Sequence, residues 1–148
     1  MWYFAYDSNM DEERIRKRGV NFNERIYGFI KGWRLAFNKV ASENPNEGYA
    51  NIEKDDNGIV EGILYQIKED GLKNLDRCEG VPDHYTREEL EVLLGNKEKV
   101  AAYVYIANKG KVNDKLKPSK EYLSHLLKGC DLLSEIYCNK LRNIETIN

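Results

Sequence analysis

Short apolar runs, alternating with polar positions, dominate the first two thirds of the chain. The apolar stretch at residues 2–6 predicts a first strand. Apolar positions interrupted by glycines over residues 24–40 predict one or two bent strands. Alternating runs at residues 86–94 and 100–107 predict two further strands, joined by a short turn that contains an Asn. These segments together predict a sheet.

The segment between residues 49 and 67 predicts a β-hairpin. Apolar runs at 49–53 and 59–67 flank the tetrapeptide DDNG at residues 55–58. An Asn-Gly pair between two such runs is a strong short-range hairpin signal. The preceding stretch, residues 41–48 (ASENPNEG), is rich in turn-forming residues and predicts an exposed loop.

Helical patterns occur in four segments, at residues 11–18, 69–79, 119–129 and 132–145. We expect the first helix to be capped by Ser8 or Asn9 and to end at Gly19. Gly80 is expected to end the second helix. The last two segments have apolar residues at steps of three and four, which is typical of helices packed on a core.

The order of these elements favours a mixed α/β (α+β) fold. Because hairpins rather than regular helical crossovers join most strands, we expect a small curved, barrel-like mixed sheet with flanking helices. A doubly wound sheet is disfavoured for the same reason. No repeat, internal linker or low-complexity tract divides the chain, so residues 1–148 are predicted to form a single domain.

Composition and charge narrow the function classes. The 23 basic and 25 acidic residues give a net charge of −2, so no basic field is available for nucleic acid. No apolar run is long enough for a membrane span, and the N-terminal residues lack a signal-peptide pattern. Cys78, Cys130 and Cys138 are odd in number and lack a disulfide-framework spacing, which indicates a reducing compartment. We therefore expect a cytoplasmic protein; its oligomeric state is left open.

The first candidate site is the loop at residues 6–10, between the first strand and the first helix. Free N–H groups at a helix start, together with the helix dipole, favour a bound anion. The ordinary alternative is a capped helix, since Asn9 and Glu12 have capping-box spacing. The spacing alone favours this alternative. Asp7, a carboxylate in the middle of the loop, is unexpected for an anion site.

The second candidate is Glu79, in the sequence LDRCEGV (residues 75–81). On a helix, Leu72, Leu75 and Glu79 share one face, so the leucines draw Glu79 towards the core. The negative end of the helix dipole also raises the pKa of a carboxyl group there. A partly buried glutamate with a raised pKa suits general base catalysis near neutral pH. The ordinary alternative is an exposed residue at a frayed helix end.

The tyrosines, the histidines and the charged residues offer weaker candidates for a functional site. Tyr103 and Tyr105 lie on the same face of a predicted strand, where they form either a cavity wall or ordinary barrel packing. His84 and His125 are the only histidines, and no Cys/His pair has metal-ligand spacing, so no metal site is expected. The charged stretch at residues 11–18 is most simply solvated surface.

Four segments of this chain, in order, resemble the gamma-glutamylcyclotransferase family. YFAYDSNM (residues 3–10) resembles the family's YGSN-type opening, and LDRCEGV looks like its catalytic-glutamate segment. AAYVYIAN (residues 101–108) is similar to its tyrosine-bearing strand, and PSKEYLSHLLKG resembles the final helix segment of its prokaryotic-type members. The resemblance spans residues 2–142.

The resemblance implies a mixed α/β fold with a barrel-like sheet and a cofactor-independent reaction without metal. This reaction, of transferase or lyase type, cyclises a γ-glutamyl group of a small molecule to 5-oxoproline and releases an amine or amino acid. Glu79 falls on the family's catalytic glutamate, as general acid and base, and Tyr103 on its active-site tyrosine. The substrate-binding loop falls on Tyr6, Asp7, Ser8 and Asn9, whose backbone N–H groups would bind the substrate's carboxylate or developing oxyanion.

Asp7 departs from the family pattern, which has glycine at this position. Its carboxylate would repel the substrate's carboxylate, unless it points outward or binds the substrate's ammonium group. Three alternatives therefore stay open: an ordinary cyclotransferase, a relative with an altered substrate, and a non-catalytic small-molecule-binding relative. The sequence does not identify the leaving amine.

Overall fold

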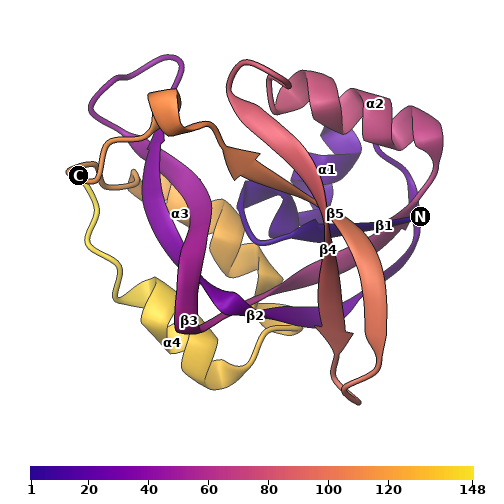
Figure 1. Ribbon diagram of the computed structural model, residues 1–148. Helices are drawn as coiled ribbons and strands as arrows, with labels where there is room; N and C mark the ends of the chain where they lie inside the picture. Colours follow the sequence, from indigo (N-terminus) through magenta and orange to yellow (C-terminus); the bar gives the residue numbers. More distant parts are fainter.

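The computed structural model describes residues 1–148 as a closed five-stranded barrel with flanking helices (Figure 1). The strand order around the barrel is β1-β3-β2-β4-β5, and β5 closes onto β1. The β1–β5 pair is parallel and the other neighbouring pairs are antiparallel, so the mixed barrel-like sheet is confirmed. The strands are β1 (Trp2–Ala5), β2 (Phe22–Val40), β3 (Gly48–Ile67), β4 (Tyr85–Leu94) and β5 (Lys99–Ala107).

The predicted hairpin at residues 49–67 is wrong, because β3 is one continuous strand. The hairpin of this region joins β2 to β3 through the loop at residues 41–47. Within β3, the pairing with β2 is irregular at the tetrapeptide 55–58. Lys31 pairs with Ile59 but Trp33 pairs with Lys54, so β3 contains extra residues at this point. A Cβ on Gly58 would lie 2.2 Å from the Trp33 carbonyl oxygen. The glycine therefore permits a close approach of two strands rather than a reversal of the chain.

The helices agree with the four predicted segments in place but differ in detail. They are α1 (Glu12–Lys17), α2 (Glu69–Cys78), α3 (Lys120–Leu127) and α4 (Glu135–Arg142), with 3₁₀ turns η1 (Ser8–Met10), η2 (Lys109–Lys111) and η3 (Lys128–Asp131). Gly19 and Gly80 follow α1 and α2 with φ of +80° and +65°, which is the expected C-terminal stop. None of these helices has the length and apolar character needed to cross a membrane.

The cap of α1 differs from the prediction. Asp11, rather than Ser8 or Asn9, caps this helix, and its Oδ1 accepts hydrogen bonds from the backbone N–H groups of Glu13 and Arg14. The Asn9–Glu12 capping box is therefore wrong. Because η1 intervenes between β1 and α1, Asn9 is fully buried and its side chain is available for other contacts.

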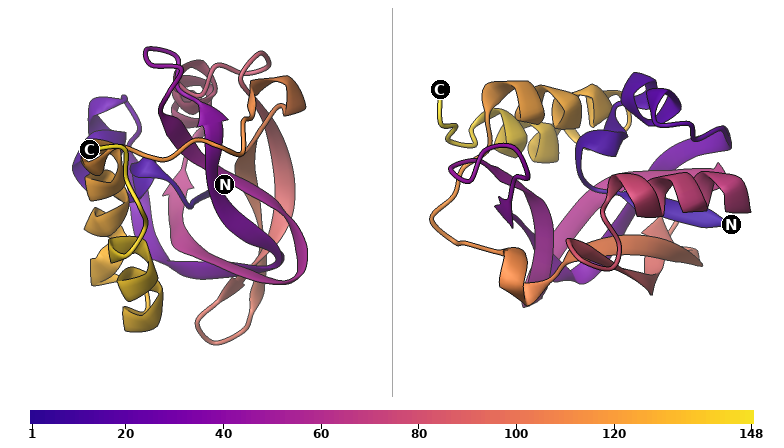
Figure 2. Two further views of the ribbon diagram at one scale, coloured as in Figure 1. Left: turned by 90° about the vertical axis from the view of Figure 1, so that its left-hand side faces the viewer. Right: turned by 90° about the horizontal axis from the view of Figure 1, so that it is seen from above.

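The core fills the barrel and the layer between the barrel and its helices. α3 and α4 lie next to each other against one side of the barrel, and α3 also contacts η1 (Figure 2). Tyr3, Tyr6, Tyr65 and Tyr105 are among the largest fully buried side chains. Tyr6 donates to the Tyr105 carbonyl and Tyr65 to the Asn9 carbonyl, at 2.5 and 2.7 Å. These bonds satisfy hydroxyl groups that would otherwise destabilise the core.

Two of the three cysteines form a disulfide, although neither their number nor their spacing indicated a disulfide framework. Cys130 in η3 and Cys138 in α4 form a disulfide, because the turn between these elements brings their Cα atoms to 5.9 Å. Cys78 is free and exposed.

Candidate functional site

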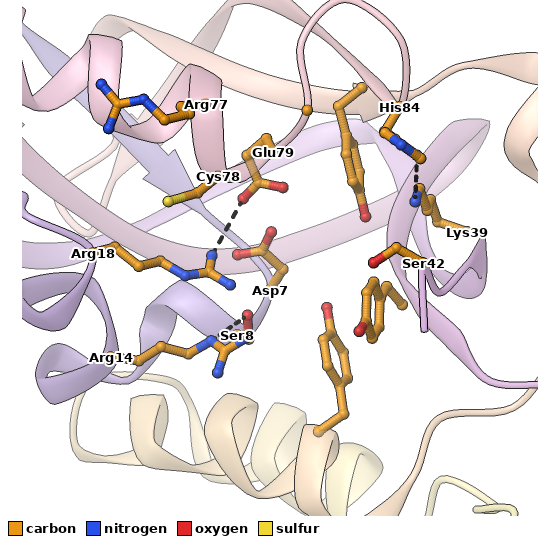
Figure 3. A pocket seen from close by; sticks show the side chains of 14 residues that line it. Asp7, Ser8, Arg14, Arg18, Lys39, Ser42, Arg77, Cys78, Glu79 and His84 are labelled. Atoms are coloured by element: carbon orange, nitrogen blue, oxygen red, sulfur yellow. Dashed lines mark hydrogen bonds and ion pairs between the residues drawn. The ribbon is translucent and has the colours of Figure 1, made fainter. Parts of the chain in front are cut away.

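A polar cavity of about 260 Å³ opens beside the end of β1 (Figure 3). The turn after β1 contributes Asp7 and Ser8 to its wall, and the end of α2 contributes Glu79. Arg14 from α1 and Lys39 from β2 also line it. The two segments that the sequence singled out, at residues 6–10 and 75–81, therefore meet at one cavity.

Helix α2 places Glu79 at the cavity wall. Leu72 and Leu75 are buried, which anchors one face of the helix against the core. Glu79 is the C-cap of α2, its N–H donates to the Leu75 carbonyl at 2.8 Å, and the positive φ of Gly80 turns the chain away. Only 7% of Glu79 is exposed. The inward orientation expected from the spacing of the leucines is confirmed, and the exposed alternative is excluded.

Asn9 and Arg18 hold the Glu79 carboxylate. The Asn9 amide donates to Glu79 Oε1 at 3.3 Å and to the Tyr3 hydroxyl at 3.0 Å. Arg18 Nη1 lies 3.8 Å from Glu79 Oε1 and donates to Asn9 Oδ1 at 2.9 Å. Asn9 thus lies behind the carboxylate and fixes its position rather than lining the cavity itself.

Burial raises the pKa of Glu79 to about 8. The negative charge of Asp7 adds to the rise, whereas the cations Arg18, Arg14 and Lys39 oppose it. The direction agrees with the sequence argument, but loss of hydration is the main cause. Such a carboxyl group can both accept and return a proton near neutral pH.

Asp7 is also buried, with 4% of its surface exposed, and its side chain lies beside Glu79 at the cavity (Figure 3). The possibility that Asp7 points outward is therefore excluded. Asp7 Oδ1 accepts a hydrogen bond from the Asn9 backbone N–H at 3.1 Å. Burial raises the pKa of Asp7, while this N–H, Arg18 and Arg14 lower it. The Asn9 N–H, a donor that we expected the loop to offer to an anion, is thus engaged within the protein.

Arg14 and Arg18 line the cavity, so the expectation that residues 11–18 are solvated surface is wrong for these two side chains. Arg14 Nε donates to Ser8 Oγ at 3.1 Å, and Arg14 Nη1 lies 3.5 Å from His125 Nε2. His125 Nδ1 in turn lies 2.9 Å from Asp11 Oδ2. The signal that was missed is their spacing: arginines four residues apart share one side of a helix that starts beside the candidate loop.

The opposite wall of the cavity carries a second basic pair, also missed by sequence reasoning. Lys39 Nζ lies 3.0 Å from His84 Nδ1 and donates to the Val40 carbonyl at 2.8 Å. Burial lowers the pKa of Lys39, and the Lys39 charge lowers the pKa of His84. These residues are 45 positions apart, and no local pattern connects them.

The structure does not bring Tyr6 or Tyr103 to the cavity wall. Tyr6 is 1% exposed and is held by the Tyr105 carbonyl. The Tyr103 ring lies under Arg87, whose guanidinium carbon is 5.0 Å from the ring centroid. It is Tyr105 that reaches α2, where its hydroxyl donates to Asp76 Oδ1 at 2.7 Å. The structure therefore groups Asp7, Ser8, Asn9 and Glu79, and the substrate-binding roles of Tyr6 and Tyr103 stay predictions.

No group of three or more His, Cys, Asp and Glu side chains in the chain has the arrangement needed to hold a metal ion. The cavity wall does combine two carboxylates with the arginine and lysine side chains of Arg14, Arg18, Lys39 and Arg77 and with the imidazole of His84. Such a wall suits a small zwitterionic or anionic molecule.

The closed barrel and its buried carboxylates define a small α/β protein with a polar cavity, and comparison with known proteins identifies its family. The AIG2-like family matches residues 59–141, which is more than half of the chain. The chain therefore belongs to the AIG2-like family, and the resemblance to gamma-glutamylcyclotransferases is confirmed at the level of family and fold.

Two curated relatives and one solved structure show the extent of this similarity. "Putative gamma-glutamylcyclotransferase YkqA" of Bacillus subtilis is 33% identical over 84 residues, which cover 55% of this chain and 29% of that protein. "Putative gamma-glutamylcyclotransferase MJ1514" of Methanocaldococcus jannaschii is 30% identical over 54 residues, which cover 36% of this chain and 45% of that protein. A structure titled "Gamma-glutamyl cyclotransferase" matches all of this chain and 89% of its own, with a TM-score of 0.88 and 24% identity. The aligned segments thus span less than half the length of the two curated relatives.

Proposed function

We propose that this chain is a gamma-glutamylcyclotransferase-type enzyme, which converts a γ-glutamyl compound into 5-oxoproline and a free amine or amino acid. The observation that supports this most strongly is Glu79, a buried carboxyl group with a pKa of about 8 at the wall of a polar cavity. The family membership and the names of the relatives point in the same direction.

Glu79 would act first as the base. The α-ammonium group of the γ-glutamyl substrate must lose a proton before its nitrogen can attack the γ-carbonyl carbon, and the Glu79 carboxylate accepts this proton. The new C–N bond closes a five-membered ring and gives a tetrahedral intermediate with a negatively charged oxygen, and the ring nitrogen then releases its second proton to water. When the bond to the leaving nitrogen breaks, protonated Glu79 returns a proton to the departing amine.

Much of the rate acceleration would come from holding the substrate in a folded conformation. Because the attack is intramolecular, the cavity needs only to bring the amine and the γ-carbonyl of one molecule together. Arg14 and Arg18 line the same cavity as Glu79 and offer guanidinium groups to the substrate's carboxylate. Lys39 lies on the opposite wall, where it favours a second negative group on the leaving amine.

A second candidate function is a non-catalytic γ-glutamyl-binding protein. The observation that favours it is Asp7, which adds a second buried carboxylate next to the expected base. This carboxylate raises the pKa of Glu79 and so reduces the fraction of ionised base at neutral pH.

An assay for 5-oxoproline separates these candidates. We would incubate the protein with a panel of γ-glutamyl amino acids, peptides and amines, and measure 5-oxoproline by mass spectrometry. We expect release from at least one compound, and loss of at least a hundredfold in Glu79→Gln. Glu69→Gln, an exposed residue at the start of the same helix, is the matched control and should retain the wild-type rate. Absence of 5-oxoproline with every compound, from protein that is folded, would exclude the enzyme.

A further inference from the structure

Asp7 is a buried carboxylate with no cation of its own. No Lys, Arg or His nitrogen lies within 4.0 Å of it, and no side chain donates a hydrogen bond to it. The two nearby guanidinium groups have other partners, since Arg18 contacts Asn9 and Glu79 while Arg14 contacts Ser8. A buried carboxylate that accepts one backbone hydrogen bond but has no cation in direct contact is costly, and this cost falls when a ligand supplies a positive charge at contact distance.

The loop around Asp7 also has fewer free N–H groups to offer an anion than its position at a helix start suggests. The Asn9 N–H donates to Asp7 Oδ1, and the Met10 N–H donates to the Asp7 carbonyl. The Asn9 N–H thus already binds a negative charge, that of the Asp7 side chain, and the Met10 N–H is engaged by a backbone carbonyl. The remaining face of this carboxylate lies at the cavity beside Glu79 (Figure 3).

We propose that Asp7 is a specificity-determining residue, whose carboxylate binds the α-ammonium group of an amino-acid ligand. The ligand's carboxylate then contacts the guanidinium groups of Arg14 and Arg18 on the neighbouring wall. This inference rests on the proposed γ-glutamyl function, and it assigns different tasks to the two acids. Asp7 holds the ammonium group by charge, and Glu79 removes one of its protons. The site therefore selects ligands with a free amino group over dicarboxylates of the same length.

The test compares the binding of L-glutamate with that of glutarate, which lacks only the amino group. With isothermal calorimetry at pH 7, we expect wild-type protein to bind L-glutamate at least tenfold more tightly than glutarate. In Asp7→Asn, which retains an oxygen to accept from the Asn9 N–H, this preference should fall by about tenfold. Asp83→Asn removes an exposed carboxylate next to His84 and is the charge-matched control, so its preference should equal that of wild type.

Three results of the binding test would overturn the proposal: equal binding of the two ligands by wild type, an unchanged preference in folded Asp7→Asn, or binding of neither ligand. Asp7→Gly provides an independent test. An increase in kcat/KM for 5-oxoproline release in this variant would mean that Asp7 only obstructs the cavity, and would also overturn the proposal. Failure of the proposed function looks different. In that case no 5-oxoproline forms, but the preference for L-glutamate and its dependence on Asp7 persist.

Discussion

Glu79 lies at the end of α2 with 7% of its surface exposed, and two charged neighbours, Asp7 and Arg18, act on it in opposite directions (Figure 3). Asp7 raises its pKa, whereas Arg18 lowers it. Because burial is the largest contribution, the carboxyl group carries its proton into the neutral pH range even with several cations around it. The proton affinity of Glu79 is therefore set by the balance of a few side chains, and single substitutions should shift it measurably.

Glu79 should make the folded state less stable as pH rises. Its folded-state pKa of about 8 exceeds the ordinary 4.5, so its contribution is fully present below about pH 4.5 and is lost as pH rises through 8. Relative to wild type, Glu79→Gln should thus gain stability between pH 5 and pH 8.5. Urea unfolding at several pH values, followed by tyrosine and tryptophan fluorescence, measures this difference. Parallel stability curves for the two proteins would contradict the raised pKa.

Removal of the Arg18 charge should move the activity to higher pH. Arg18→Gln takes away a cation that lowers the pKa of Glu79, so the base becomes ionised later in a titration. We expect the rising limb of kcat/KM for 5-oxoproline release to shift towards alkaline pH. Arg16→Gln is the control, since Arg16 is exposed on the same helix and lies near Glu12. An unchanged profile in Arg18→Gln would show that Arg18 does not act on the base.

At the scale of elements, sequence patterns predicted the helices and most strands well. They failed where close contact between two strands, rather than a local signal, determines the backbone conformation. The helix over residues 69–79 was predictable because its leucine spacing and terminal glycine are local signals. The tetrapeptide at 55–58 has an equally clear local signal for a turn, yet it lies within β3. Pairing with the long strand β2 overrides that signal, because Gly58 fits against the Trp33 carbonyl.

Gly58 should tolerate no side chain. A Cβ at this position would lie 2.2 Å from the Trp33 carbonyl oxygen, so β2 or β3 must shift to accept it. We expect Gly58→Ala to lower the free energy of unfolding by about 1–3 kcal/mol. Gly110→Ala, where no atom lies within 4 Å of the added Cβ, should change it by less than about 0.5 kcal/mol. Chemical denaturation of both variants measures the contrast, and equal stabilities would contradict the close strand approach.

Buried leucines anchor α2 against the core and so hold Glu79 in place. Leu75 is fully buried, so Leu75→Ala should cost about 2–5 kcal/mol of stability through lost apolar burial and a residual cavity. Lys73→Ala changes an exposed position of the same helix and should have little effect. A cost below about 1 kcal/mol for Leu75→Ala, measured by denaturation, would be inconsistent with an anchored helix end at Glu79.

At the scale of the whole molecule, closure of the barrel brings together residues that no sequence window connects. Lys39 comes from the end of β2, His84 from the turn before β4, and Arg18 from the end of α1. Motif order identified Asp7 and Glu79, because each lies in a short segment with its own pattern. The basic residues around them belong to unremarkable charged or alternating stretches, so only the folded chain shows that they surround the carboxylates.

The direct titration of the Glu79 carboxyl group tests whether the fold creates a base suited to neutral pH. Glutamate side chains would be labelled with carbon-13 at the carboxyl carbon, and the Glu79 signal identified by its absence from the spectrum of Glu79→Gln. We predict that this signal titrates near pH 8 in the folded protein and near pH 4.5 after unfolding. A folded-state midpoint near 4.5 would contradict the role of Glu79 as a buried general base.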